Sequence, residues 1–183
     1  MPGQKHDRSD ATLSPRLTPS RMSEVDFVAR FGGVFEHSPW IATHAFAAGL
    51  GPEQDTAAGL HAALAAQFRR ASEAERLAVL RAHPDLAGKL ASARRLTEDS
   101  AAEQAGAGLD ALTDAERTNF TELNARYRQR FGFPFIIAVK GLNKRQILST
   151  FEARVAHDRA AEFETACRQV ERIALLRLQE MSF

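Results

Sequence analysis

The chain has 183 residues, 44% of them hydrophobic, and its 24 basic and 23 acidic residues give a formal net charge of +1. This length suits one domain with a substantial core rather than two, and the near-zero charge gives no reason to expect nucleic acid or an acidic membrane as a partner. No apolar run is long enough to span a bilayer, and the single cysteine excludes an intrachain disulfide and favours a reducing compartment.

Residues 1–22 are mostly polar and include Pro15 and Pro19. They lack the apolar centre of a secretory signal, and their composition does not favour a packed core. The last residues do not form a peroxisomal address of the Ser-Lys-Leu type. We therefore expect a disordered tail at residues 1–22, one folded domain over residues 23–183, and a cytoplasmic location.

The folded part is predicted to open with two short helices. Residues 23–31 carry two phenylalanines four positions apart, and a glycine pair follows them. Ser38 and Pro39 are suited to cap and to open a second helix that continues to Ala47. Both patterns indicate helices that bury one apolar face.

The sequence offers no convincing metal site. His37 and His44 stand seven positions apart across the start of the second helix, and no third ligand follows at matching spacing. Cys167 lies at helical spacing among apolar residues, which is typical of a buried structural thiol. We therefore predict no bound metal.

The next two helices lead to the most informative junction in the chain. An alanine-rich helix is predicted over residues 56–71, and Ser72 with Glu75 forms a capping box for another. Pro84 disfavours helical backbone at the residue before it, so that helix should end at or before His83. An imidazole held there can exchange a proton near neutral pH. The alternative is that His83 only complements the helix dipole as a cation.

After this junction, Asp85 is suited to cap a helix from Leu86 to about Leu96. Ser100 and Glu103 repeat the capping-box spacing before a short helix that two glycines end. If Glu103 has only a structural role, its carboxylate folds back onto the start of that helix. The start of such a helix is also a place where an anionic ligand can bind backbone N–H groups.

The second half of the chain predicts two further helices around an apolar segment. A helix over residues 113–131 is followed by residues 133–139, which have the strongest strand-like composition in the chain. No second strand is available to pair with this run. We expect an extended segment whose backbone groups line a pocket; the alternative is a buried apolar connector.

A helix is predicted to restart after Gly141-Leu142-Asn143, with Arg154 beside its apolar stripe, and Asp158 caps the long terminal helix. Together these patterns predict an all-α, single-domain bundle of about seven or eight helices with one extended pocket-lining segment.

Three stretches together resemble the OHCU decarboxylase family, whose substrate is 2-oxo-4-hydroxy-4-carboxy-5-ureidoimidazoline (OHCU). The likeness extends from about Phe27 to Leu178 and includes residues 34–40 and 173–178. The three stretches are His83-Pro84-Asp85-Leu86-Ala87-Gly88-Lys89, residues 100–110 and residues 124–141.

The resemblance implies a homodimeric enzyme of urate degradation that converts OHCU into (S)-allantoin without a cofactor. The substrate can itself take up the electron pair that remains when CO2 leaves, because a C=N bond adjoins the reacting carbon. By this likeness, His83 is the catalytic acid/base and Glu103 its carboxylate partner. The implied substrate contacts are Pro84, Ser100, Ala101, Ala102, Glu103, Gln104, Phe135, Ile136, Ile137, Ala138, Val139 and Arg154.

Two features of the sequence depart from the family pattern, and two other classes of protein are alternatives to the family. Residues 49–52 replace an Arg-Pro-Phe turn, and His157 replaces an expected asparagine, which bears on pocket shape and substrate choice. The His-Pro-Asp tripeptide at residues 83–85 also occurs in J-domain co-chaperones, which bind without catalysis. A second alternative is a helical interaction protein with a vestigial pocket.

Overall fold

The structure is a computed structural model that describes residues 16–86 and 98–183. Within these ranges the chain forms eight α-helices, two 3-10 turns and no strand, which confirms the predicted all-α fold. None of the described helices combines the length and apolar character needed to cross a membrane. The elements are η1 (Pro19–Arg21), α1 (Glu24–Phe31), α2 (Trp40–Ala47), η2 (Pro52–Asp55), α3 (Ala57–Arg70), α4 (Glu73–Ala82), α5 (Glu98–Gly106), α6 (Asp114–Phe131), α7 (Lys144–Arg154) and α8 (Arg159–Gln179).

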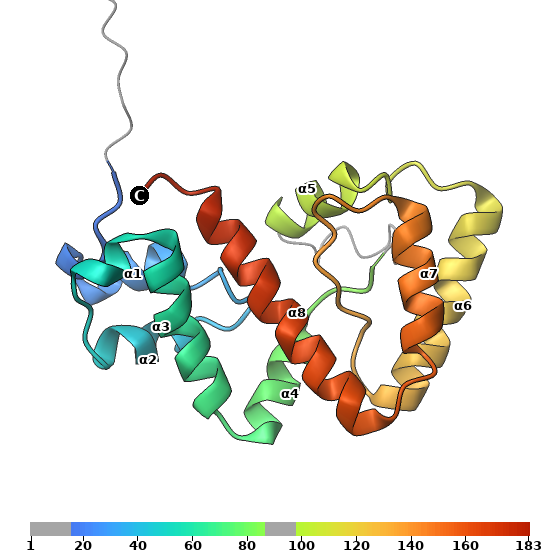
Figure 1. Cartoon of the computed structure of the whole chain (residues 1–183), viewed down its shortest axis with the longest axis horizontal. Helices are drawn as coiled ribbons and strands as arrows, with labels where there is room; N and C mark the ends of the chain where they lie inside the picture. The colour runs from blue at the N-terminus through green and yellow to red at the C-terminus, as the bar shows by residue number, and fades with distance from the viewer. Residues whose placement is uncertain (1–15, 87–97) are drawn as a thin grey trace, which may run out of the picture.

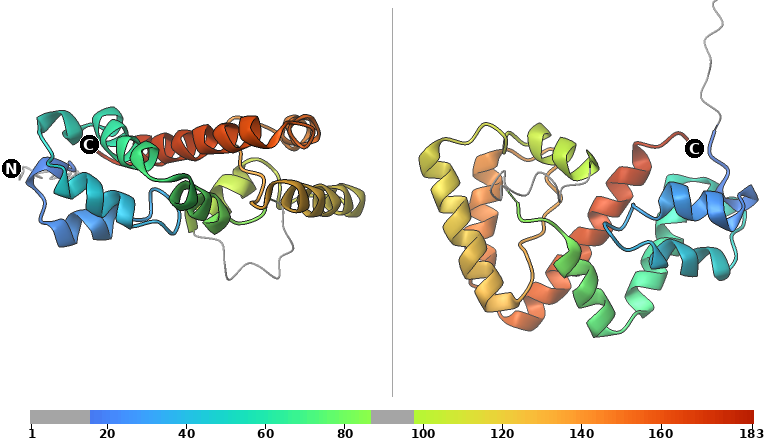
Figure 2. Two further views of the ribbon diagram at one scale, coloured as in Figure 1. Left: turned by 90° about the horizontal axis from the view of Figure 1, so that it is seen from below. Right: turned by 180° about the vertical axis from the view of Figure 1, so that it is seen from behind.

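The long terminal helix α8 organises the domain. It crosses the molecule between a group formed by α1, α2 and α3 and a group formed by α5, α6 and α7 (Figure 1). It packs against α3, α4 and α6, and the two further views show it running along one side of the molecule (Figure 2). Residues from both halves of the chain therefore meet at α8.

Local sequence signals explain where most helices begin and end. The capping boxes of Ser72 with Glu75 and of Thr113 with Glu116 form as predicted. Gly132 ends α6 with a φ of 80°, a left-handed conformation that glycine adopts without steric cost. Side chains cap six of the helices through Ser23, Thr56, Ser72, Thr113, Asn143 and Asp158.

Some predicted boundaries are wrong. Ser38 does not cap α2; its hydroxyl donates to the carbonyl of Glu36 at 3.1 Å, and Pro39 occupies the cap position. The short helix α5 begins at Glu98, so Ser100 is its third residue and not its cap. The helix predicted from Leu86 to Leu96 lies, beyond Leu86, outside the described residues.

Residues 17–20 pack against other parts of the chain, so the folded unit begins before residue 23, where it was predicted to begin. The backbone N–H of Leu17 donates to the carbonyl of Ser182 at 2.8 Å. The Ser20 backbone N–H and hydroxyl donate to the Asp55 carboxylate at 2.8 and 2.7 Å. These contacts attach the segment around η1 to both η2 and the end of the chain.

Residues 133–139 form neither a helix nor a strand, as expected for an extended segment between α6 and α7. Most of its side chains are buried, and the ring of Phe135 stacks on Phe151 of α7 at 3.9 Å. The edge of Tyr127 packs against the same two rings. Aromatic packing thus replaces the ladder of hydrogen bonds that would hold a strand.

Candidate active site

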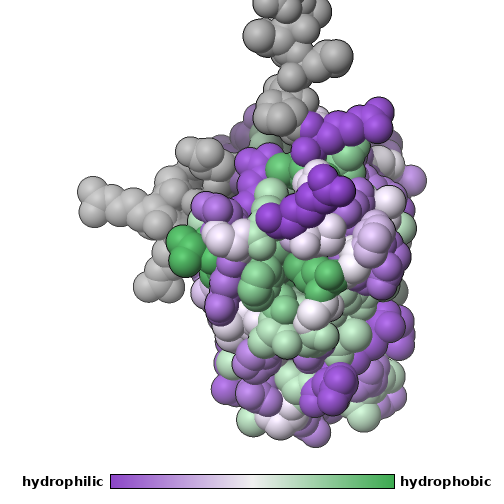
Figure 3. All heavy atoms as spheres, turned by 90° about the vertical axis from the view of Figure 1, so that its left-hand side faces the viewer, coloured by the Kyte–Doolittle hydropathy of each residue, from purple (hydrophilic) through white to green (hydrophobic). Residues whose placement is uncertain are grey.

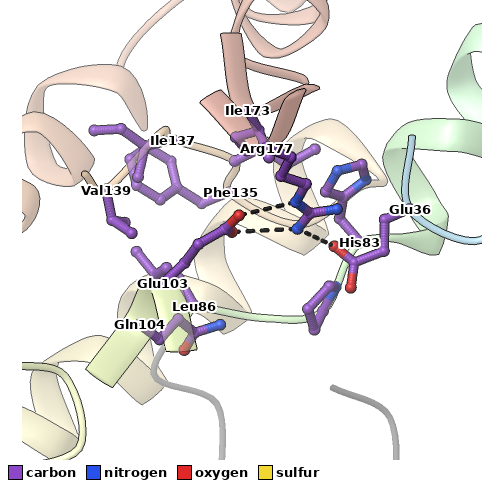
Figure 4. A pocket seen from close by; sticks show the side chains of 12 residues that line it. Glu36, His83, Leu86, Glu103, Gln104, Phe135, Ile137, Val139, Ile173 and Arg177 are labelled. Carbon is purple, nitrogen blue, oxygen red and sulfur yellow. Dashed lines mark hydrogen bonds and ion pairs between the residues drawn. The ribbon is translucent and has the colours of Figure 1, made fainter. Parts of the chain in front are cut away.

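An open pocket with about 360 Å³ of empty space lies where the junction after α4, helix α5, the extended segment and α8 converge. Figure 4 shows side chains from all of these elements turned toward it. Its lining residues are Glu36, His83, Pro84, Leu86, Glu103, Gln104, Phe135, Ile136, Ile137, Val139, Ile173 and Arg177. The structure therefore brings His83 and Glu103 to one pocket.

The local backbone sets the tautomer of His83. His83 is the C-cap of α4, with extended backbone angles before Pro84, as predicted. Its side chain is 6% exposed, and its Nδ1 lies 2.9 Å from the carbonyl of Val79. Because a carbonyl only accepts, Nδ1 carries a proton, so in the neutral ring Nε2 keeps its lone pair.

The pKa of His83 lies below its ordinary value because burial penalises the charged ring, although the Val79 carbonyl and Glu36 act in the opposite direction. The imidazole is consequently neutral near pH 7. This disfavours the interpretation of His83 as a cation that complements the helix end, and it suits a base with an available Nε2.

Arg177 joins two carboxylates at the pocket wall. Its Nε donates to Glu103 Oε1 at 2.8 Å and its Nη2 to Glu103 Oε2 at 3.2 Å. The same Nη2 lies 3.1 Å from Glu36 Oε2 (Figure 4). Arg177 is 5% exposed and Glu36 is 1% exposed, so their pair is shielded from solvent. The Glu103 carboxylate therefore faces Arg177 instead of serving as a helix cap.

Sequence reasoning missed Arg177 and Glu36 as site residues. Arg177 does carry a signal, because it stands seven residues after Val170 on the inward-facing stripe of α8, where a charged residue is unexpected. Glu36 follows two apolar residues in a loop, and nothing in the local pattern distinguishes it from a surface carboxylate.

The predicted site residues do not all lie at the pocket. The catalytic candidate His83 lines the pocket together with seven predicted substrate contacts: Pro84, Glu103, Gln104, Phe135, Ile136, Ile137 and Val139. Ala138 lines an adjoining hollow of about 260 Å³ that shares Glu103 and Arg177 with the pocket. Ala101 and Ala102 are exposed on α5 and line neither hollow, and the side chain of Ser100 lies outside the described part of the chain.

The structure does not bring Arg154 into the pocket lining, contrary to the expected substrate contact. Its guanidinium is buried and donates to the carboxylate of Glu162 and to the carbonyl of Ile136. The guanidinium therefore points at the Ile136 carbonyl, which belongs to the backbone of the pocket wall. Arg177, on the next helix, supplies the guanidinium that the pocket contains.

Among the described residues, no group of three histidine, cysteine or acidic side chains is arranged to hold a metal ion. His44 packs against the edge of Trp40 at 5.4 Å, and His37 is exposed in a loop with a φ of 53°.

Comparison with known proteins shows the family of the chain. The family model for OHCU decarboxylase matches residues 20–179. The 2-oxo-4-hydroxy-4-carboxy-5-ureidoimidazoline decarboxylase of Halalkalicoccus jeotgali is 41% identical over 91% of this chain and 93% of its own. The protein of the same name from Haloferax volcanii is also 41% identical, over 88% and 92% of the two chains.

Two solved structures are similar in fold. A crystal structure of (S)-allantoin synthase superposes with a TM-score of 0.68 at 31% identity, over 88% of this chain and 51% of that one. A crystal structure of OHCU decarboxylase in the presence of (S)-allantoin gives a TM-score of 0.61 at 21% identity, over 77% and 89% of the two chains. With the match of the family model to nearly the whole folded part, this chain belongs to the OHCU decarboxylase family.

Proposed function

We propose that this member of the OHCU decarboxylase family carries out its reaction, the conversion of OHCU into (S)-allantoin and CO2, in the pocket that His83 and Glu103 share. One observation carries the assignment of the site. A neutral imidazole with an available Nε2 and a carboxylate–guanidinium pair come from separate elements to line the same pocket.

The reaction needs little beyond orientation and proton transfer. When the C–CO2 bond breaks, its electron pair forms a C=C bond to the neighbouring carbon, and the electron pair of the C=N bond moves onto the ring nitrogen, which gains a proton. The hydroxyl then loses its proton as the carbonyl forms, and the neighbouring carbon gains a proton. Overall one proton is taken up for each CO2 released. The neutral His83 Nε2 is suited to accept the hydroxyl proton, because the Val79 carbonyl fixes the tautomer.

Arg177 and Glu103 provide the charges around the reacting groups. The Arg177 guanidinium attracts the substrate carboxylate, and two carboxylates keep the guanidinium in the wall. Glu103, at the pocket edge, orients the substrate and takes part in the transfer of the proton. The backbone of Phe135–Val139 supplies donors and acceptors for the imidazoline ring and the ureido group.

The decisive experiment is chirality-resolved product analysis with freshly generated OHCU, because uncatalysed decay gives racemic allantoin. The wild-type protein should accelerate the disappearance of OHCU and yield (S)-allantoin. His83→Asn keeps a donor for the Val79 carbonyl but lacks Nε2, so it should give only the racemic background while its helical circular dichroism persists. A wild-type protein that does not exceed spontaneous decay would favour the non-catalytic alternatives.

We also propose that the protein is a cytoplasmic homodimer, as the family likeness implies. The face in Figure 3, on the side that carries α1 and α2, shows apolar side chains gathered within polar margins. Val25 of α1 is 78% exposed, which is unusual for a large apolar residue. Light scattering during size-exclusion chromatography should give twice the mass of one chain; a monomer at micromolar concentration would contradict the proposal.

A further inference from the structure

The extended wall of the pocket is held by side chains behind it. Arg154 Nη1 donates to the carbonyl of Ile136 at 2.8 Å, and the backbone N–H of Ala138 donates to Gln169 Oε1 at 2.9 Å. In an extended chain the backbone groups of alternate residues point the same way. The two bonds therefore tether one edge of the segment and direct the N–H and C=O of Ile137 to the opposite edge.

Arg154 is itself locked by a buried cluster. Its Nε and Nη2 donate to Glu162 Oε1 at 3.0 and 2.6 Å, and the Tyr127 hydroxyl donates to the same oxygen. His157 Nδ1 lies 2.8 Å from Glu162 Oε2. Glu162 is fully buried and Arg154 is 5% exposed. A guanidinium bonded in this way has one orientation, so its remaining nitrogen meets Ile136 at a defined position.

The same guanidinium also contacts the side chain of the wall. The Arg154 Cζ lies 4.5 Å from the centre of the Phe135 ring, and that ring stacks on Phe151. One residue outside the pocket lining thus restrains both the ring of Phe135 and the carbonyl of the next residue, and both of these residues line the pocket.

We propose that Arg154 and Gln169 are positioning residues that set the register of the Phe135–Val139 wall against the substrate. The proposal rests on the proposed function of the pocket and assigns neither residue to the chemical step. The wall contacts parts of the substrate that do not react. Its displacement should therefore weaken binding, raising KM, more than it lowers kcat.

The test compares conservative pairs of variants. Arg154→Lys keeps a charge beside Glu162, but a single ammonium cannot bond to Glu162 and Ile136 and also cover Phe135; KM for OHCU should rise about tenfold with kcat within about threefold. Gln169→Leu should also raise KM, because the Ala138 N–H loses its acceptor. Gln169→Glu keeps an acceptor oxygen for the Ala138 N–H, so the KM of this variant should equal the wild-type value.

Arg69→Lys is the matched control. Arg69 also donates two bonds to a glutamate of α8, Glu171, but it does not touch the wall. The KM and kcat of Arg69→Lys should stay at wild-type values. If both Arg154→Lys and Gln169→Leu keep the wild-type KM while His83→Asn is inactive, the positioning role is overturned and the assignment of the active site stands.

Amide hydrogen exchange of the peptide covering residues 133–140 provides a readout that does not depend on activity. Exchange should accelerate in Arg154→Lys and Gln169→Leu and stay unchanged in Arg69→Lys and Gln169→Glu. Unchanged exchange in the first two variants would overturn the proposal. If the wild-type protein does not act on OHCU, the proposed function fails, and exchange alone decides whether these residues position the wall.

Discussion

Replacing Glu103 by glutamine separates its role in turnover from its role in folding. Its side chain is 28% exposed, and the amide oxygen of glutamine can still accept from Arg177 Nε. A partly exposed ion pair contributes about 1 kcal/mol or less to stability. For a domain of this size, such a loss lowers the melting temperature by only about 2–4 °C.

The expected effect on catalysis is much larger. Glutamine cannot hold or pass the proton that we propose the carboxylate transfers, and loss of a general acid or base typically costs about 10²–10⁴-fold in rate. A hundredfold fall in kcat corresponds to about 2.7 kcal/mol of transition-state stabilisation. Glu103→Gln should therefore lose at least about 2.7 kcal/mol in the chemical step and about 1 kcal/mol or less in folding.

The assay follows the formation of (S)-allantoin from fresh OHCU by circular dichroism, with thermal unfolding of the same samples. Glu164→Gln is the control, because Glu164 pairs with Arg76 at 3.2 Å, is 54% exposed and lines neither hollow. It should leave both activity and melting temperature unchanged. Full activity in Glu103→Gln with a melting temperature lowered by many degrees would refute the reasoning and make Glu103 a structural residue.

Three further predictions concern the pH dependence, the thiol and a turn. Burial lowers the pKa of His83, so the folded state disfavours its protonation. Stability should fall as pH drops below about 6.5, by at most about 1.4 kcal/mol per pH unit from this group; a urea titration at pH 5–8 that slopes equally in His83→Asn would contradict this. Burial raises the pKa of the Cys167 thiol to about 11, so only about 0.1% is ionised at pH 8 and a disulfide reagent should label it only after unfolding. Gly132→Ala should lower stability by about 1 kcal/mol, because an L side chain must adopt the φ of 80°; an unchanged denaturation midpoint would refute it.

Sequence reasoning predicted the helices well where the signal is local. A serine or threonine three residues before a glutamate predicted the starts of α4 and α6, because a capping box involves only neighbouring residues. It was wrong for α5, where the same spacing occurs but the helix begins at Glu98. Spacing alone does not show whether Glu103 turns back to its own helix or reaches Arg177.

The sequence by itself determined the helical class, the junction that ends α4 at His83, and the family, because caps, proline sterics and apolar periodicity act over a few residues. Only the tertiary structure decided which guanidinium enters the pocket. Arg154 and Arg177 each stand on or beside an apolar stripe, and the one that lines the pocket is decided by how α7 and α8 pack against residues 133–139. Contacts between segments so far apart in the chain depend on packing, which no local pattern encodes.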